Sequence, residues 1–231
     1  MGHRDTITGI SFDSDNDQFY TTSNDRSLKV WNIREMMYMD SHYGHQSDIL
    51  AMSQYSRDRV MSCGLDRQVI FWKVNEDTEL LYKNTQHNTD TLNIINPHFF
   101  TTGSYADNCI DLWIMNKKKP IFTIADCHLN DSWILATDNV KSSDLLASSS
   151  YDGTINFYKF LKDKKEIIKT NTMTGFDGCL NCLKFSNVKG NQTKLKNEIM
   201  LAVTHSQEEK WGRWHVQPKA KNGISILRKI N

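Results

Sequence analysis

Three tryptophans recur along this chain at a constant spacing of 41 residues, at Trp31, Trp72 and Trp113. An aspartate lies six residues before each tryptophan, and a histidine lies further upstream; these residues are Asp25, Asp66 and Asp107, and His3, His45 and His87. A repeat of this length predicts an array of equivalent structural units, each of which buries a hydrophobic face against its neighbour. The repeat therefore constrains the fold more strongly than composition does.

The repeat divides the 231 residues into five segments, at approximately 1–43, 44–85, 86–126, 127–173 and 174–231. Each repeat holds short runs of β-branched and aromatic residues that alternate with polar residues and end at Asn, Asp, Gly or Ser, which indicates strands joined by turns. The period is that of a four-stranded propeller blade. We therefore predict an all-β fold, a β-propeller whose five four-stranded blades form a single domain over 1–231.

The fourth and fifth repeats depart from this pattern. In the fourth, Tyr158 takes the tryptophan position, six residues after Asp152. In the fifth, Glu208 takes the aspartate position and Trp214 the tryptophan position. We assign the first three strands of the fifth repeat to CLNCLKFS, IMLAVTH and WGRWHV, and its fourth strand to GISILRKI.

A serine or threonine precedes each repeat aspartate, so that Ser or Thr, His and Asp recur together, as they do in the catalytic set of a hydrolase. An enzyme needs one such site, whereas this set occurs in four successive repeats beside an aromatic residue. We interpret the set as a buried hydrogen-bond network that fixes blade geometry, and we predict no catalytic residue. The predicted network residues are His3, Thr21, Asp25, Trp31, His45, Ser62, Asp66, Trp72, His87, Thr102, Asp107, Trp113, His128, Ser148 and Asp152.

Composition and local motifs favour a soluble chain without metal or cofactor. The formal net charge of +1 gives no strong overall attraction to nucleic acid or membrane, and no apolar run is long enough to span a bilayer. Cys179 and Cys182 form a C-x-x-C motif, but residues three apart in a strand face opposite sides, so we expect buried free thiols. Asp13, Asp15 and Asp17 lack the glycine and glutamate of a calcium loop, so we interpret them as a solvated turn.

Lysine clusters are expected to gather on one face of the propeller. In a blade with strands A to D, the A–B and C–D loops leave one face and the D–A and B–C loops leave the other. Lysines fall in the A–B and C–D loops of repeats three to five, whereas repeats one and two place acids there: Asp13, Asp15, Asp17, Glu76, Asp77 and Glu79. Such a face can neutralise RNA phosphates, although solubilising loops explain the same lysines equally well. The predicted RNA- or partner-binding residues are Lys117, Lys118, Lys119, Lys162, Lys164, Lys165, Lys189, Lys194, Lys196, Arg213, Lys219 and Lys221.

Two features limit this prediction. Few aromatic residues lie in these loops, so we do not predict sequence-specific base readout. Arg213 lies between Trp211 and Trp214, where its guanidinium could pack on an aromatic ring or face a phosphate, and we favour packing.

The recurring Gly-His, Asp and Trp positions, such as Gly2-His3 with Asp25 and Trp31, resemble the WD-repeat family over nearly the whole chain. This resemblance implies a toroidal propeller, usually of seven blades. The chain begins at a Gly-His turn in mid-array, so either five blades close the ring or the N-terminal blades belong to sequence not present here, and we favour the second.

Several segments are similar to a narrower group, the WD-repeat subunits of the U3 small nucleolar ribonucleoprotein. The most specific is EEKWGRWHVQPKAKNGISIL, which resembles the last blade of that group and is not part of the generic repeat. The resemblance implies a non-catalytic scaffold in the nucleolus that binds U3 small nucleolar RNA and ribonucleoprotein subunits. It also implies association with the pre-ribosomal particle, with no membrane and no small-molecule substrate.

Two other classes of protein remain open. Trp31-Asn32-Ile33-Arg34 is similar to the Trp-Asp-x-Arg motif of ubiquitin-ligase substrate receptors, but Asn32 departs from it and the second repeat has Asn75 in place of the arginine. A generic WD-repeat interaction scaffold is therefore an alternative. An enzyme is also compatible with the fold alone, although no single Ser-His-Asp set differs from its copies.

Overall fold

The computed structural model describes residues 2–13, 17–84, 86–128, 132–140, 143–188, 198–209 and 212–228, with the side chains of 187, 188, 198, 209, 212–215 and 228 excepted. The chain forms two compact units. Unit 1 comprises 1–105 and 111–121, and unit 2 comprises 106–110 and 122–231. The described residues contain one short 3-10 turn, η1 (Val74–Glu76). None of their helical structure has the length and apolar character needed to cross a membrane.

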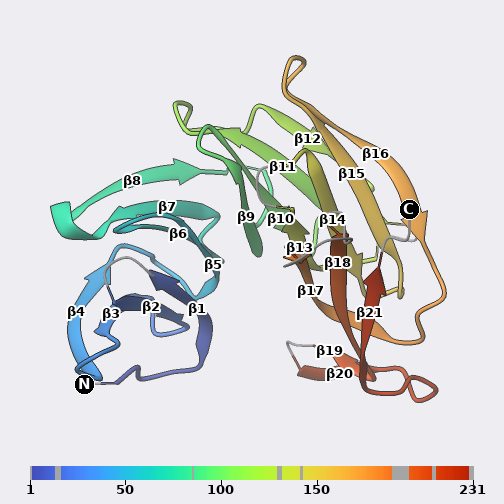
Figure 1. The fold of residues 1–231 in the computed structure, drawn as a ribbon, viewed down its shortest axis with the longest axis horizontal. Helices are drawn as coiled ribbons and strands as arrows, with labels where there is room; N and C mark the ends of the chain where they lie inside the picture. The colour runs from blue at the N-terminus through green and yellow to red at the C-terminus, as the bar shows by residue number, and fades with distance from the viewer. Residues whose placement is uncertain are drawn as a thin grey trace, which may run out of the picture. The chain divides into compact units, whose positions relative to one another are not determined.

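Four sheets have four strands each, arranged in chain order, and they coincide with the first four repeats (Figure 1). The first blade holds β1 (Ile7–Asp13), β2 (Gln18–Ser23), β3 (Ser27–Asn32) and β4 (Met37–Tyr43). The second holds β5 (Ile49–Ser56), β6 (Arg59–Gly64), β7 (Gln68–Lys73) and β8 (Thr78–Lys83). The third holds β9 (Thr91–Asn96), β10 (Phe99–Ser104), β11 (Cys109–Ile114) and β12 (Phe122–Ile124). The fourth holds β13 (Ile134–Asn139), β14 (Leu145–Ser150), β15 (Ile155–Leu161) and β16 (Glu166–Met173).

The all-β blade architecture predicted from the repeat is confirmed by these sheets. The strand boundaries follow the alternating segments of the sequence, because alternation places one set of side chains on each face of a sheet. The middle strands of the first three blades are largely buried on both faces, and in β10 every residue is buried. Whether the five repeats form one domain stays a prediction.

Hydrophobic side chains fill the space between neighbouring blades within each unit. In unit 1, Tyr20, Leu28 and Val30 of the first blade pack with Ile70 and Trp72 of the second. A second cluster in unit 1 joins the second and third blades through buried residues that include Phe71, Tyr82, Phe100 and Trp113. In unit 2, Ala147 and Ile155 of the fourth blade pack with Leu180, Leu183 and Val203. Each fully buried large side chain contributes about 1.5–3 kcal/mol to folding.

The repeat aspartates share a turn geometry between the second and third strands. The residue after each aspartate has a positive φ: 66° at Arg26, 59° at Arg67, 47° at Asn108 and 74° at Gly153. In three of these turns the carboxylate accepts the backbone N–H two residues further on, as at Ser27 with 3.0 Å between N and Oδ1. This is the local side-chain bond for which Asp is favoured in turns. The recurring aspartate therefore has a turn-forming role besides its contact with histidine.

The fifth repeat differs from the predicted strand assignment. Its sheet has the order β17 (Cys179–Val188), β18 (Glu198–Ser206) and β21 (Gly223–Arg228). The segment that we assigned as third strand instead forms β20 (Gly212–Val216), which pairs with β19 (Glu208–Glu209) in a separate two-stranded ribbon (Figure 1).

The assignment of WGRWHV as third strand and GISILRKI as fourth strand was therefore wrong. In the structure β21 pairs directly with β18, with Ala202 opposite Ile226 and Thr204 opposite Ile224. Residues 207–222, including β20, consequently connect the second and third strands of this blade. A B–C connection leaves the blade at the opposite end of its strands from the A–B loop. Two predicted binding lysines, Lys219 and Lys221, therefore lie at a different end from the one predicted.

Buried histidine networks and the candidate nucleic-acid interface

The second blade holds a complete chain of hydrogen bonds from tryptophan to aspartate. The indole Nε1–H of Trp72 donates to Ser62 Oγ over 2.7 Å, and His45 Nε2 lies 2.8 Å from the same hydroxyl. His45 Nδ1 lies 2.9 Å from Asp66 Oδ2. Because a carboxylate only accepts, the imidazole proton is on Nδ1 and Nε2 accepts the hydroxyl proton. Each donor among these four side chains then has an acceptor within the network.

The first blade repeats this arrangement with threonine in place of serine. Trp31 Nε1 donates to Thr21 Oγ1 over 2.8 Å, His3 Nε2 lies 2.7 Å from that hydroxyl, and His3 Nδ1 lies 2.9 Å from Asp25. Burial raises the pKa of the Asp25 carboxyl, but hydrogen bonds from Ser27, Arg4 and His3 outweigh burial and hold the pKa well below its usual value. The carboxylate therefore stays ionised in the folded chain.

The fourth blade replaces two members of the chain. Tyr158 takes the indole position, and its hydroxyl lies 3.1 Å from Ser148 Oγ. His128 Nε2 lies 2.7 Å from Ser148 Oγ, whereas Nδ1 lies 2.8 Å from Thr154 Oγ1. Thr154 donates in turn to Asp152 over 2.6 Å, and the direct distance from His128 Nδ1 to Asp152 is 3.9 Å. Thr154, which sequence analysis did not select, thus links the histidine to the aspartate.

Burial lowers the pKa of His128 to about 4, and the positive charge of Lys169 acts in the same direction, while Asp152 opposes both. An unfolded chain binds this proton near pH 6.5, so between pH 6.5 and 4 protons favour the unfolded state. We therefore expect the free energy of unfolding to fall over this interval, by at most about 3 kcal/mol from this group, since the folded pKa is about 4.

Urea denaturation at pH 7, 5.5 and 4.5 measures this effect, with His128→Gln as the matched variant. We expect the variant to be less stable at pH 7 and less dependent on pH down to 4.5. Equal pH dependence in the two proteins would contradict the prediction. Asp25 and Asp66 do not add to this pH dependence between pH 7 and 4.5. Because their pKa values are lowered in the folded chain, their protonation removes stability only below pH about 4.

The third blade retains only part of this chain in its described contacts. Trp113 Nε1 donates to Thr102 Oγ1 over 2.9 Å, as in the other blades. Asp107, by contrast, lies exposed in the turn before β11. The side chain of Asn84 lies near His87 and accepts the backbone N–H of His87 at Oδ1 over 3.2 Å. Asp90 accepts the backbone N–H of Tyr105. Sequence spacing did not indicate Asn84 or Asp90.

The hydroxyls of these networks are sealed from solvent. Ser62 and Ser148 are 0 % exposed, and Thr21 and Thr102 are 4 % and 1 % exposed. Each hydroxyl is also engaged by an indole or phenol on one side and, in three blades, by an imidazole on the other. A nucleophile needs a reacting carbon about 3 Å away, and no such space adjoins these buried oxygens.

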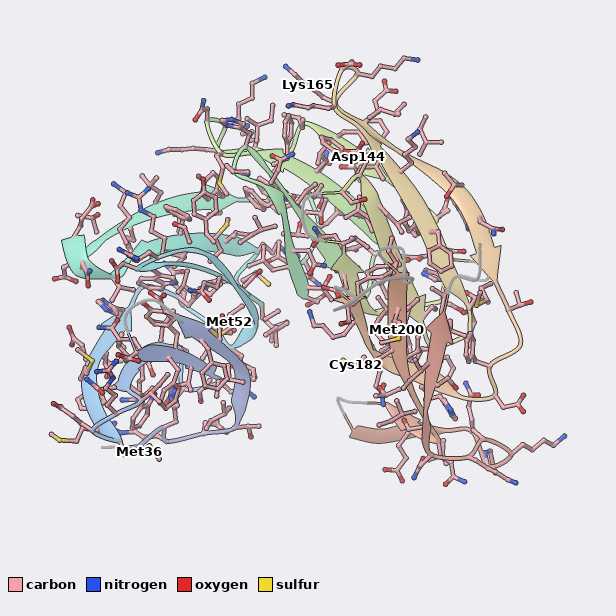
Figure 2. All side chains as sticks on the ribbon, in the orientation of Figure 1. Met36, Met52, Asp144, Lys165, Cys182 and Met200 are labelled. Carbon is pink, nitrogen blue, oxygen red and sulfur yellow. The ribbon has the colours of Figure 1, made fainter. Side chains whose placement is uncertain are left out.

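The predicted lysines of repeats three and four lie exposed in C–D loops. Lys117, Lys118 and Lys119 lie between β11 and β12 in unit 1, where the Lys118 carbonyl accepts the backbone N–H of Lys83 over 3.2 Å. Lys162, Lys164 and Lys165 lie between β15 and β16 in unit 2, and Figure 2 shows Lys165 at the tip of that loop. Within the described part of the chain, none of these six ammonium groups forms an ion pair.

The acids of repeats one and two form only part of the predicted acidic counterpart. Asp13 is 1 % exposed, accepts from the phenol of Tyr20 and from the backbone N–H of Asp58, and so is not part of a solvated turn. Its negative charge adds to burial in raising the pKa of Tyr20. Asp17 pairs with Arg34 at 2.6 Å. Asp15 lies outside the described residues.

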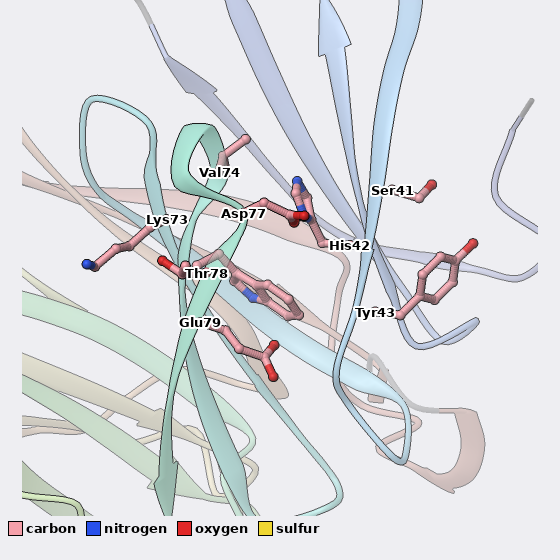
Figure 3. Close-up of a pocket in the computed structure, with 9 residues that line it drawn as sticks. Ser41, His42, Tyr43, Lys73, Val74, Asp77, Thr78 and Glu79 are labelled. Carbon is pink, nitrogen blue, oxygen red and sulfur yellow. The ribbon is translucent and has the colours of Figure 1, made fainter.

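In the second blade Glu76 pairs with cations, whereas Asp77 and Glu79 are exposed. Glu76 pairs with Lys73 at 2.9 Å and with Arg59 at 3.5 Å. Asp77 lies beside the buried imidazole of His42, with 3.4 Å between Oδ1 and Nδ1 (Figure 3). Asp77 and His42 line a pocket of about 340 Å³ together with Trp72 and Glu79. Asp77 and Glu79 thus leave exposed carboxyl groups on the second blade, whereas the described C–D loops of repeats three and four expose lysines.

The remaining predicted binding residues fall into two groups. Lys219 and Lys221 are exposed, but they lie in the connection between β18 and β21, which is the B–C edge of the blade. They were predicted to follow the third strand and to share a face with Lys162–Lys165, and this prediction was wrong because β20 is not a blade strand. Lys189, Lys194, Lys196 and the side chains of Arg213 and Trp214 lie outside the described residues.

All five cysteines are free thiols, and four of them are buried, namely Cys63, Cys109, Cys127 and Cys179. Cys182 is exposed on β17 (Figure 2), so the expectation that all thiols are buried was wrong at this position. The strand has an irregular register between Cys179 and Cys182, and the two residues face different environments. This agrees with the argument that the pair does not share one site.

Comparison with known proteins identifies the repeat. The model of the WD domain, G-beta repeat, matches residues 1–32 and 118–159. The chain contains WD repeats. Among solved structures, "Structure of U3-55K" superposes with a TM-score of 0.85 at 27 % identity, covering 97 % of this chain and 68 % of that one. "Crystal structure of RRP9 WD40 repeats" superposes with a TM-score of 0.84 at the same identity and coverage.

Curated relatives of the chain have related names. The U3 snoRNP-associated protein-like EMB2271 of Arabidopsis thaliana is 28 % identical over 97 % of this chain and 48 % of its own length. Ribosomal RNA-processing protein 9 of Saccharomyces cerevisiae is 20 % identical over 96 % of this chain and 50 % of its own length. The WD-repeat chain thus spans about half the length of the curated relatives it matches.

Proposed function

We propose that this WD-repeat chain is a non-catalytic RNA- and protein-binding scaffold of the U3 small nucleolar ribonucleoprotein. The observation that carries the proposal is the superposition on U3-55K at a TM-score of 0.85 over 97 % of the chain. It extends through the degenerate fifth blade, where the generic WD signature is weakest. The names of the curated relatives, which refer to the U3 particle and to ribosomal RNA processing, support the same function.

The described surface supports RNA as one ligand of the scaffold. Six lysines in two C–D loops have no acidic partner among the described residues, whereas Asp13 is buried and Asp17 and Glu76 are paired with cations. Unpaired cations release counterions when they meet phosphates, which favours binding independently of net charge. We assign these lysines to phosphate contact, and the His, Ser or Thr, Asp and Trp residues of the networks to blade stability.

A non-catalytic role agrees with the sealed networks. The Ser-His-Asp sets that could suggest hydrolysis have hydroxyls between 0 % and 4 % exposed. Their hydrogen bonds end on tryptophan or tyrosine inside the blades, so they act on the chain itself. The finer proposals are that the partners are U3 RNA, its protein subunits and the pre-ribosomal particle, and that the chain acts in the nucleolus in processing of small-subunit ribosomal RNA.

Crosslinking in cells followed by sequencing of the attached RNA tests this function. We expect U3 small nucleolar RNA to be enriched above other nuclear RNAs of similar abundance. A tagged chain carrying Ser62→Ala, which lowers the stability of the blade, serves as a control, and its enrichment should fall only in proportion to any loss of folded protein. Recovery of ubiquitin-ligase adaptors without U3 RNA would contradict the proposal and favour the receptor alternative.

A further inference from the structure

The pocket of about 340 Å³ in unit 1 lies between β4 of the first blade and the β7–β8 hairpin of the second, and we call it the β4–β8 pocket (Figure 3). Its volume is in the range of pockets that hold a ligand group. Figure 3 shows the imidazole of His42 pointing from β4 toward Asp77, whereas the side chains of Ser41 and Tyr43 point away from it. His42 is therefore the β4 side chain that a ligand in this pocket would meet.

Two exposed carboxylates give the β4–β8 pocket a negative charge. Asp77 and Glu79 line it, and neither forms an ion pair with a lysine or arginine among the described residues. Lys73 also lines the pocket, but its ammonium group is held by Glu76 at 2.9 Å. The charges described at this pocket therefore favour a cationic ligand.

The backbone positions both carboxylates. An added Cβ at Gly44 would lie 2.6 Å from Glu79 Oε2 and 2.9 Å from Trp72 Cη2, so the absence of a side chain at Gly44 leaves room for the carboxylate beside the indole. Asp77 ends the turn η1, where its backbone N–H donates to the Val74 carbonyl over 3.3 Å. Binding groups whose backbone is ordered beforehand lose less entropy when a ligand binds.

A buried imidazole nitrogen supplies an independent sign of a ligand. His42 is 8 % exposed, and its ring lies 6.0 Å from that of Trp72. Its Nδ1 lies 3.4 Å from Asp77 Oδ1, and because a carboxylate only accepts, this contact favours the tautomer with the proton on Nδ1. Nε2 is then an acceptor, and it is buried with no hydrogen-bond partner in the described structure. Since buried polar atoms are nearly always paired in folded proteins, Nε2 indicates that a donor is missing from this pocket.

A guanidinium group fits these requirements. It is always charged, and it carries five N–H donors and no acceptor in a planar fork, so one group can donate to a carboxylate and to an imidazole nitrogen together. A phosphate would be repelled by Asp77 and Glu79. Within the part of the chain that the structure describes, His42, Asp77 and Glu79 do not bring their ligand atoms close enough together to hold a metal ion.

We propose that the β4–β8 pocket binds an arginine side chain in a basic segment of a protein partner. The guanidinium donates to Asp77, Glu79 and His42 Nε2. Asp40 is exposed two residues before His42 on the same face of β4, which extends the negative charge along the strand for further basic residues of the segment. The inference goes beyond the proposed function, because it names the chemistry of a protein partner and requires neither U3 RNA nor the C–D lysines.

Binding of a fluorescein-labelled decapeptide of alternating glycine and arginine to the purified full chain tests the pocket by anisotropy. Asp77→Asn with Glu79→Gln removes two exposed charges and should weaken binding by about tenfold or more, because hydrogen bonds to charged groups are lost. The control is Glu35→Gln with Asp126→Asn, an equal charge change on exposed residues outside the pocket. Because exposed charges act weakly at a distance, we expect this control to change affinity by less than about threefold.

The ligand has a matched control of its own, since citrulline has nearly the shape of arginine without its charge. We expect the glycine–citrulline decapeptide to bind at least about tenfold more weakly than the arginine peptide. His42→Phe, which keeps a ring but removes the acceptor, should weaken binding of the arginine peptide severalfold. Circular dichroism establishes that each variant is folded, and the Asp77/Glu79 variant decides the question if His42→Phe is not.

Four results would overturn the pocket as an arginine site. They are equal affinities of the Asp77/Glu79 variant and its control, equal affinities of the citrulline and arginine peptides, displacement of the peptide by calcium chloride at constant ionic strength, and binding of oligouridylate that this variant abolishes. The third would assign the pocket to a metal ion, and the fourth would assign it to RNA.

The same variant separates the pocket from the proposed function. Loss of peptide binding in the Asp77/Glu79 variant, with no U3 RNA among the cellular crosslinks of the unaltered chain, would support the pocket and contradict the U3 assignment. Crosslinks to U3 RNA, with peptide binding unchanged in this variant, would do the reverse.

Discussion

Replacing His45 by alanine is expected to destabilise the chain by about 3–5 kcal/mol, which is a large fraction of the stability of an ordinary domain. The substitution removes the partner of Asp66, whose side chain is 5 % exposed, and the acceptor of the Ser62 hydroxyl proton. The Asp66 carboxylate still accepts the backbone N–H groups of Gln46 and Gln68, so it loses only part of its hydrogen bonding. The loss of one donor to a buried carboxylate, the loss of the acceptor of the Ser62 hydroxyl and a new cavity together account for the magnitude.

The network can be tested one bond at a time. Ser62→Ala leaves the Trp72 indole N–H without its acceptor and His45 Nε2 without its donor, and should cost about 2–3 kcal/mol. Ser62→Thr keeps the hydroxyl that the first and third blades carry as Thr21 and Thr102, and should recover much of this loss. His98→Ala is the matched control, because His98 is exposed on a turn, and it should change stability by less than about 0.5 kcal/mol.

Urea denaturation followed by tryptophan fluorescence measures these effects. The double variant His45→Ala with Ser62→Ala should cost less than the sum of the two single variants, because they break a shared bond. Strict additivity, or a Ser62→Ala variant as stable as His98→Ala, would show that the network does not stabilise the blade.

Reversing the charge of the C–D lysines is expected to give the largest loss of RNA affinity. Changing Lys117, Lys118 and Lys119 to Glu, or Lys162, Lys164 and Lys165 to Glu, replaces three exposed cations by anions in one loop. If two or three of them contact phosphates, affinity for U3 RNA falls about 10²-fold at low salt, and the slope of log K against log salt flattens by about 2.

The two loops are tested separately and together by anisotropy with U3 RNA, from 50 to 200 mM salt. Reversal of Arg4, Arg26 and Arg67 is the matched control, with the same change in charge on exposed positions in other turns. Because a general electrostatic effect would act on all three sets alike, equal losses in the control would exclude these loops as the binding surface. An unchanged salt slope would do the same.

Much of the fold and of the networks could be predicted from the sequence, because the 41-residue period fixes both strand spacing and hydrogen-bond partners. In the first two blades each predicted network residue is hydrogen-bonded to its predicted neighbour. Where the repeat departs from this pattern, in the third and fourth blades, the predicted network is partly wrong. Thr154 enters the network of the fourth blade, and Asp107 lies exposed in the third.

Local sequence pattern is enough to predict β-blades, because alternation and turn residues act over a few positions and need no distant partner. The tertiary structure alone decided which strands pair in the fifth repeat, since both WGRWHV and GISILR alternate like strands and only the distant β18 selects between them. That pairing places Lys219 and Lys221 at the opposite end of the blade from the position predicted. The tertiary structure likewise decided the burial of Asp13 and the exposure of Cys182, because burial depends on neighbouring blades, which local pattern does not specify.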